Sequence, residues 1–147
     1  MEKAEKYRLL ERQLTALLEG ETDVIAKMAN VAAVLHETFG FWWTGFYRVT
    51  GDELVLGPFQ GPVACMHIPF GKGVCGTAWK RNETVVVPDV EQFPGHIACS
   101  SASRSEIVVP VHAADGSVTA VLDIDSDRLA TFDEEDRIWL ERIVKLL

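Results

Sequence analysis

The segment 106-EIVVPVHAADGSVTAVLDID-125 decides the fold. Its two ends, 106–111 and 118–125, are rich in β-branched residues, and the residues between them include the Asp-Gly pair typical of a tight turn. The segment therefore predicts a β-hairpin. Because successive side chains of a strand leave opposite faces of a sheet, alternate residues of the hairpin also predict which side chains share a face.

Helices are predicted on both sides of this hairpin in the chain. Apolar residues recur at helical spacing over 3–18 and 23–39, with Thr22 as the expected N-cap of the second helix. The run Thr131-Phe132-Asp133-Glu134 reads as a capping box that opens a last helix, and that helix carries Ile138 and Leu140 among its apolar residues.

The remaining elements are shorter. Strands are expected over 41–49, 53–59 and 84–87, a strand interrupted by loops within 60–73, a short helix over 74–81, and an irregular stretch over 89–104. The order predicts an α+β fold: one domain over residues 1–147, with a central, mostly antiparallel sheet flanked by helices. A loop as long as 89–104 in a compact domain is more often functional than not.

Composition and charge restrict the function. The formal net charge is −8 and no basic cluster interrupts it, so we expect no nucleic-acid partner. No apolar run reaches the ~18 residues that a membrane span needs. Residues 1–6 lack the apolar region of a secretory signal. We therefore expect a cytoplasmic protein without a membrane partner.

Three acidic residues share one face of the predicted hairpin. Asp123 and Asp125 are two positions apart in a strand, so both side chains leave the same face. A four-residue loop would place Glu106 opposite Asp123, a two-residue turn would place it opposite Asp125, and an odd-length loop would separate it from both. The face also carries Val108 and Val121. A solvated surface and an acidic pocket, able to hold an ammonium or to keep one carboxyl protonated, both remain open.

Trp43 and Tyr47, four positions apart in the first strand, also share a face, either in the core or as the wall of a pocket for a small apolar group. The chain has three cysteines, Cys65, Cys75 and Cys99. An odd count argues against a disulfide framework, and composition alone favours three small buried residues. No Cys-x-x-Cys or His-x-x-x-His pair is present, so we expect no metal and no cofactor.

Six stretches share one resemblance: 42-WWTGFY-47, 57-GPFQGPVAC-65, 71-GKGVCGTA-78, 95-GHIAC-99, 105-SEIVVP-110 and 122-LDIDS-126. Together they resemble the free methionine-(R)-sulfoxide reductases, a family built on the GAF domain. The resemblance runs from about residue 20 to the end of the sequence. The trio of cysteines is its most specific part, because most GAF domains lack it.

The resemblance implies reduction of free L-methionine-(R)-sulfoxide by a GAF domain, usually a homodimer. Cys99 would be the nucleophile and Cys65 the resolving thiol, with Cys75 as the alternative, and thioredoxin would regenerate the dithiol.

The resemblance also assigns the pocket. Glu106, Asp123 and Asp125 would bind the substrate ammonium and polarise the sulfoxide. Trp43 and Tyr47 would enclose the methyl group.

Other functions remain open on the sequence alone: a non-catalytic GAF module for a ligand such as a cyclic nucleotide, a thiol redox sensor, or a thiol peroxidase. The first would need a basic or hydroxyl-rich phosphate cradle, which the sequence does not show. His96 would either favour the Cys99 thiolate or hydrogen-bond within its loop, and His67 is expected to be structural.

Overall fold

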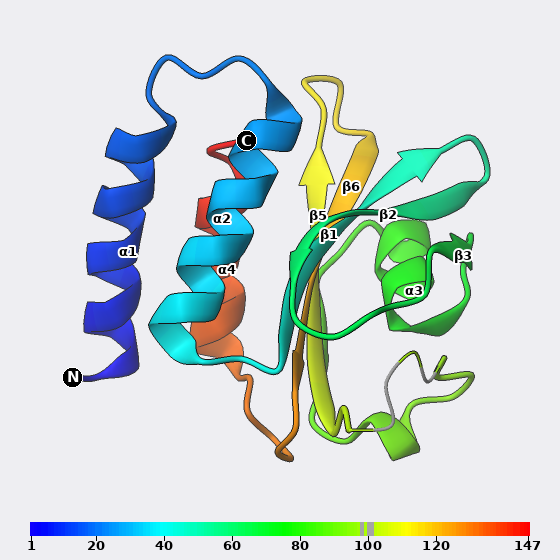
Figure 1. Ribbon diagram of the computed structural model, residues 1–147. Helices are drawn as coiled ribbons and strands as arrows, with labels where there is room; N and C mark the ends of the chain where they lie inside the picture. Colours follow the sequence, from blue (N-terminus) through cyan, green and yellow to red (C-terminus); the bar gives the residue numbers. More distant parts are fainter. Residues whose placement is uncertain (98, 100–101) are drawn as a thin grey trace.

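An antiparallel sheet separates two layers of helices (Figure 1). The computed structural model describes residues 1–97, 99 and 102–147. In this part of the chain the helices are α1 (Lys3–Leu18), α2 (Val24–Phe39), α3 (Gly73–Arg81) and α4 (Glu134–Val144), with a 3₁₀ turn η1 (Val90–Gln92). The strands are β1 (Trp43–Thr50), β2 (Glu53–Gln60), β3 (His67–Pro69), β4 (Val85–Val87), β5 (Ser105–His112) and β6 (Val118–Ser126).

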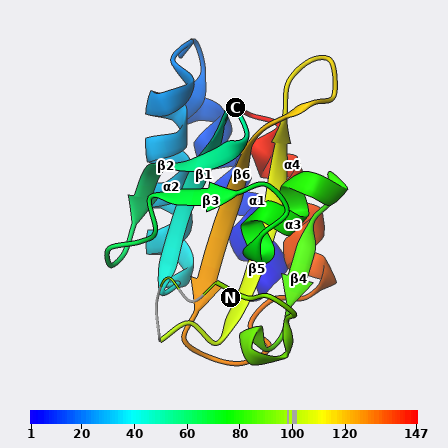
Figure 2. The ribbon, with the colours of Figure 1, turned by 90° about the vertical axis from the view of Figure 1, so that its right-hand side faces the viewer.

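The strand order is β3-β2-β1-β6-β5-β4, and every pair is antiparallel. Helices α2 and α4 cover one face, with α1 packed on them from outside, and α3 lies on the other face, toward the viewer in Figure 2. The predicted α+β fold is therefore confirmed. None of the helices in the described residues has the length and apolar character needed to cross a bilayer.

Each face of the sheet has its own apolar core. Phe46, Leu122 and Ile124 pack with the three-helix layer, whereas Val108 and Val121 pack toward α3. Strand β5 is consequently buried along almost its whole length, on both sides. The face that carries the acids is thus a covered face, not the solvated surface that the sequence left open.

The hairpin reaches the predicted pairing by a route that the sequence analysis did not foresee. Five residues, 113–117, separate the two strands, so the loop has an odd length. The register shifts by one residue where His112 pairs with Val118, which leaves Thr119 as a β-bulge. The bulge compensates for the odd loop, and Glu106 lies opposite Asp125. The prediction of one shared face is confirmed.

Two helix caps were predicted wrongly. Asp23, not Thr22, caps α2, because its carboxylate accepts from the Ile25 and Ala26 backbone N–H groups. The capping box of α4 is Asp133 with Asp136. Thr131 cannot take that role, because its hydroxyl is engaged with the Ser126 hydroxyl and the Arg128 carbonyl.

Ile138 is 48% exposed, whereas Leu140 is fully buried. Two positions along a helix correspond to about 200° of rotation, so the two residues face opposite sides.

Gly45 makes room for the aromatic side chains of β1. A Cβ at this position would lie 2.4 Å from the Phe59 Cβ and 2.6 Å from the Trp43 ring. That space is filled because Trp43 stacks on Phe59, with ring centroids 5.2 Å apart, and on Tyr47 at 5.9 Å. The glycine therefore lets Trp43 lie over the strand.

Gly45→Ala should destabilise the fold by about 1–3 kcal/mol, because the added methyl group overpacks a filled site. Urea unfolding followed by circular dichroism measures this loss. Gly57→Ala is the matched control in β2, where the nearest atom, the Phe46 carbonyl oxygen, would be 3.1 Å from the new Cβ. Equal stabilities of the two variants would contradict the proposed role of Gly45.

Candidate active site

A pocket lies between the α3 face of the sheet and the two loops that carry Cys65 and Cys99. The sheet supplies Trp43, Tyr47, Glu106, Asp123 and Asp125; the start of α3 supplies Lys72, Gly73, Val74 and Cys75; the loops supply Val63, Ala64, His96, Ile97, Cys99 and Ser103; and Ile68 of β3 completes the lining. Seven of the eight residues singled out in the sequence thus line one pocket. The eighth, Cys65, lies outside this lining and is bonded to Cys99.

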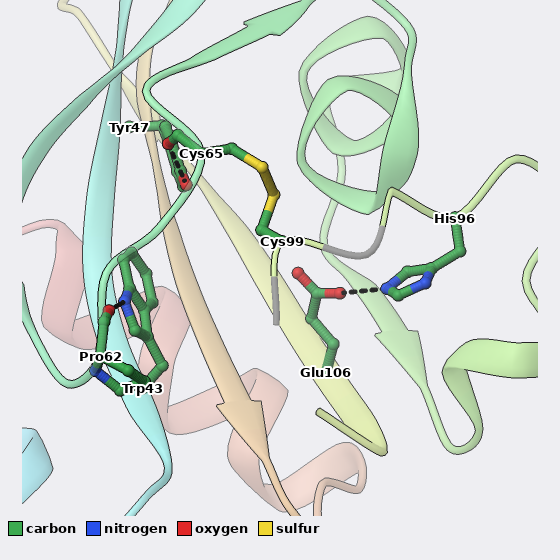
Figure 3. The surroundings of a disulfide bond; sticks show 7 residues. All are labelled: Trp43, Tyr47, Pro62, Cys65, His96, Cys99 and Glu106. Carbon is green, nitrogen blue, oxygen red and sulfur yellow. Dashed lines mark hydrogen bonds and ion pairs between the residues drawn. A yellow bond between two sulfur atoms is a disulfide. The ribbon is translucent and has the colours of Figure 1, made fainter. Parts of the chain in front are cut away.

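Cys65 and Cys99 form a disulfide with their Cα atoms 5.4 Å apart (Figure 3). The third cysteine, Cys75, is a buried free thiol in the first turn of α3. The two half-buried cysteines are therefore the disulfide-bonded pair in this structure, across a sequence separation of 34 residues.

The two aromatic residues of β1 also hold the segment that bears Cys65. The Trp43 indole Nε1 donates to the Pro62 carbonyl oxygen at 3.0 Å, and the Tyr47 hydroxyl donates to the Cys65 carbonyl oxygen at 2.8 Å (Figure 3). Both side chains are almost fully buried. They serve at once as wall of the pocket and as anchors of the loop above it.

The three carboxyl groups form the floor of the pocket. Glu106 and Asp123 are only 6% and 5% exposed, and Asp125 lies directly opposite Glu106. The Glu106 carboxyl is hydrogen-bonded with both aspartates, and the Cys75 thiol with Asp123. Among the described residues, Asp123 Oδ1 has no hydrogen-bond partner. A buried carboxylate oxygen without a partner is costly, so the floor is built to receive a donor.

Burial raises the pKa of all three carboxyls. For Glu106 the burial effect comes first and the charges of Asp123 and Asp125 add to it, which places its pKa well above the usual range. The pKa of Asp125 is also raised well above its usual range, by burial and then by Asp123. Because like charges this close resist joint ionisation, the cluster retains a proton that it can deliver to a ligand.

The Cys75 thiol is a poor nucleophile in this setting. Burial raises its pKa well above the usual range, and the charges of Asp123 and Glu106 raise it further. Since the thiolate is the reactive form of cysteine, Cys75 is held in the unreactive form.

His96 contacts the acidic floor, which the sequence analysis did not predict. Its Nε2 lies 3.8 Å from Glu106 Oε1, and the two side chains point toward each other in Figure 3. Burial lowers the pKa of His96. No local pattern in the sequence indicates this contact, because His96 and Glu106 belong to different elements of the predicted fold.

Lys72 and the beginning of α3 bring positive potential to the same pocket. Lys72 is exposed and is the N-cap of α3, with no side-chain capping bond. The first backbone N–H groups of a helix have no partner within the helix and attract anions. The pocket therefore combines an acidic floor with an anion-attracting wall, as a zwitterion requires.

The same floor has the donor atoms for a metal ion. The Cys75 thiol and one carboxylate oxygen each from Glu106 and Asp123 all lie within 4.8 Å of one another. These three groups together attract positive charge. An organic ammonium supplies that charge as directly as a metal ion does.

The chain is similar to known proteins along nearly its whole length. A family model described as the GAF domain matches residues 19–147. GAF domain-containing protein A of Dictyostelium discoideum is 57% identical over 99% of this chain and 92% of its own length. The free methionine-R-sulfoxide reductase of Escherichia coli (strain K12) is 47% identical over 100% of this chain and 89% of its own.

The chain is also similar to a solved structure along nearly its whole length. The X-ray structure of the free methionine-R-sulfoxide reductase from Neisseria meningitidis, in complex with its substrate, superposes with a TM-score of 0.96 at 55% sequence identity. The match covers 99% of this chain and 88% of that one. Similarity at this level exceeds a shared fold alone.

Glu106→Gln should stabilise the ligand-free protein at neutral pH. A carboxyl whose pKa is raised on folding stays protonated in the folded state after the unfolded chain has lost its proton near pH 4, so the stability it contributes falls as pH rises. A gain of at least about 1 kcal/mol, or roughly 2–4 °C in Tm, is expected near pH 7 and little at pH 4.

Thermal unfolding of both proteins between pH 4 and pH 8 measures this difference. Glu37→Gln, which replaces an exposed acid of α2, is the control. A wild type that is more stable than Glu106→Gln throughout that pH range would contradict the raised pKa of Glu106.

Proposed function

Because the chain belongs to the GAF domain family and, within it, to the free methionine-(R)-sulfoxide reductases, we propose that it reduces free L-methionine-(R)-sulfoxide to methionine in the pocket described above. One observation carries this proposal. The Cys65–Cys99 disulfide lies beside a pocket whose floor is three carboxyl groups, those of Glu106 and Asp123 buried and that of Asp125 half-buried. A thiol pair beside a proton source is what the reduction of a sulfoxide requires.

The pocket matches each part of a free amino acid. The substrate ammonium would bind over Glu106, Asp123 and Asp125, where it relieves their mutual repulsion and gives Asp123 Oδ1 a donor. The α-carboxylate would lie toward Lys72 and the start of α3, and the S-methyl group against Trp43 and Tyr47. A peptide-bound residue lacks both charges, which favours the free substrate.

In the first half-reaction, the Cys99 thiolate attacks the sulfoxide sulfur. The oxygen takes the proton that the acidic cluster retains, with Glu106 as the donor, because burial and the charges of both aspartates raise its pKa well above the usual range. The hydroxyl then passes from the substrate sulfur to the Cys99 sulfur as the bond between the two sulfur atoms breaks. Methionine leaves with the electron pair of its sulfur restored, and Cys99 is left as the sulfenic acid.

In the second half-reaction, the Cys65 thiolate attacks the Cys99 sulfur, and the hydroxyl leaves as water after taking a proton. The product is the disulfide present in this structure. Two observations favour Cys65 over Cys75 as the resolving thiol: the disulfide itself, and the burial that raises the pKa of Cys75. Thioredoxin would then reduce the disulfide by thiol–disulfide exchange.

The competing functions fit the pocket less well. A redox sensor or a thiol peroxidase would form the same disulfide. Neither function requires three carboxyl groups arranged to bind a cation. A cyclic-nucleotide module would place a phosphate above this floor, where Glu106 and Asp123 would repel it.

We also propose that residues 1–147 act as one catalytic domain in the cytoplasm, where reductants can return the disulfide to thiols. A homodimer would cover apolar side chains that α1 leaves half-exposed, namely Leu9 and Leu17.

Cys99→Ser should abolish reduction and leave the fold intact, because it removes the attacking thiolate. Cys65→Ser should still convert about one equivalent of sulfoxide per chain and then stop, unless Cys75 takes over the resolving role. Methionine formed in a single turnover without external thiol separates the two variants, and mass spectrometry identifies the cysteine products. One equivalent of methionine from Cys99→Ser, or a dominant Cys75–Cys99 bond in the wild type, would reverse these roles.

N-acetyl methionine sulfoxide should be a poor substrate, because acetylation removes the ammonium charge. Loss of one charge-assisted hydrogen bond lowers kcat/KM by roughly ten- to a hundredfold. Asp125→Asn should weaken activity on the free amino acid strongly and change the residual activity on the acetylated form little. Steady-state rates with both substrates measure this, and equal kcat/KM values in the wild type would remove ammonium binding from the role of the carboxyls.

A further inference from the structure

The two loops that carry the redox pair are uncharged. Neither 60–66, which bears Cys65, nor 92–103, which bears Cys99, contains an Asp, Glu, Lys or Arg, although such residues make up 24% of the chain. Within the first loop, two apolar side chains stand in solvent: Val63 is 89% exposed and Met66 is 67% exposed. Cys65 lies between them. Large exposed apolar side chains around a reactive group mark an interaction surface.

The two sulfur atoms of the disulfide face different surroundings. Cys99 lines the substrate pocket, whereas Cys65 lies outside that lining. The Cys65 segment is held from the protein side by the hydrogen bonds of Trp43 and Tyr47 (Figure 3). The Met66 carbonyl oxygen also accepts from the Leu56 backbone N–H at 2.9 Å, which ties this residue to β2. These hydrogen bonds fix the backbone around Cys65, whose side chain is half-buried.

We propose that Val63 and Met66 form the docking surface for the protein dithiol that regenerates the enzyme, and that this dithiol attacks the Cys65 sulfur. This inference rests on the proposed sulfoxide reduction with thioredoxin as reductant. The incoming thiolate bonds to Cys65 Sγ, the disulfide electron pair passes to Cys99 Sγ, and Cys99 leaves as a thiolate. The second thiol of the reductant then attacks the sulfur of the reductant's first cysteine, which is bonded to Cys65 in the mixed disulfide. Cys65 is released and takes up a proton, and the reductant becomes the disulfide.

Charge favours this surface for a protein partner. The chain carries a net charge of −8, so an approach over most of its surface would place a protein beside fixed charges. An uncharged, apolar rim can be covered by a protein without the cost of desolvating fixed charges, and it excludes water from the mixed disulfide. Attack at Cys65 also releases Cys99 into the pocket, where the next sulfoxide binds.

The test compares a protein reductant with a small one. Met66 does not line the pocket and lies outside the catalytic machinery, so Met66→Glu should leave kcat/KM unchanged when dithiothreitol drives turnover. With thioredoxin, kcat/KM for the reductant should fall at least tenfold. Met66→Leu should keep the wild-type value, and so should Leu129→Glu, which alters an equally apolar side chain that is 49% exposed on the loop after β6.

Several outcomes would overturn the proposal. One is an unchanged thioredoxin rate in Met66→Glu; another is an equal loss with dithiothreitol, which would place Met66 in the chemistry. If light scattering shows that Met66→Glu and the wild type differ in molar mass, the surface is an interface with a second copy of the chain. A wild type that turns over with dithiothreitol but not with thioredoxin would overturn the docking surface and leave sulfoxide reduction standing. Failure with both reductants would overturn the proposed function itself.

Trapping identifies the attacked sulfur. A thioredoxin variant in which the second active-site cysteine is replaced by serine stops at the mixed disulfide. Peptide mapping by mass spectrometry should find that bond at Cys65 of the wild-type enzyme, and a bond at Cys99 would overturn the assignment.

Discussion

Three carboxyl groups on a covered face of the sheet are the constraint on which the rest of the site depends. Glu106, Asp123 and Asp125 lie on adjacent strands, where their charges oppose one another and burial removes the water that would otherwise solvate them. The fold tolerates this because both faces of the sheet carry apolar cores. The result is a site in which ligand binding relieves a strain that the empty protein bears. Within the described part of the chain, Asp123 Oδ1 has no hydrogen-bond partner, which marks where that relief is needed.

The same side chains link the substrate pocket to the redox pair. Trp43 and Tyr47 wall the pocket, and their polar atoms hold the segment that ends in Cys65. Gly45 between them keeps the surface of β1 flat enough for the Trp43 ring. Changes to these residues would therefore affect substrate binding and disulfide formation together, because one set of contacts supports both.

The three cysteines occupy three environments. Cys99 lines the pocket, Cys65 is half-buried outside that lining, and Cys75 is buried beside Asp123. One sulfur of the disulfide therefore belongs to a residue that lines the pocket, and the other to a residue outside that lining. Burial sets the reactivity of Cys75 apart, since its raised pKa withholds the thiolate.

The hairpin, the helical periods and the alternation within strands are local patterns, and they were sufficient to predict the α+β fold and the shared face of the three acids. The element boundaries over α1 and α2 also follow from apolar spacing and the Gly40 C-cap. The caps at Asp23 and Asp133 were missed because Ser, Thr and Asp can all cap a helix. Which residue does so depends on the other hydrogen bonds that each side chain makes, as Thr131 makes one with Ser126.

Other features of the site were decided by tertiary structure alone. Local pattern does not show that a bulge at Thr119 would correct an odd loop, that His96 would reach Glu106 from a long irregular segment, or that Cys65 would meet Cys99. The family resemblance, not residue spacing, suggested the cysteine pairing. Side-chain alternation is a property of the chain itself and can be read along it. Contacts between loops, and the burial that sets each pKa, depend on which distant segments pack together, so they exist only in the folded protein.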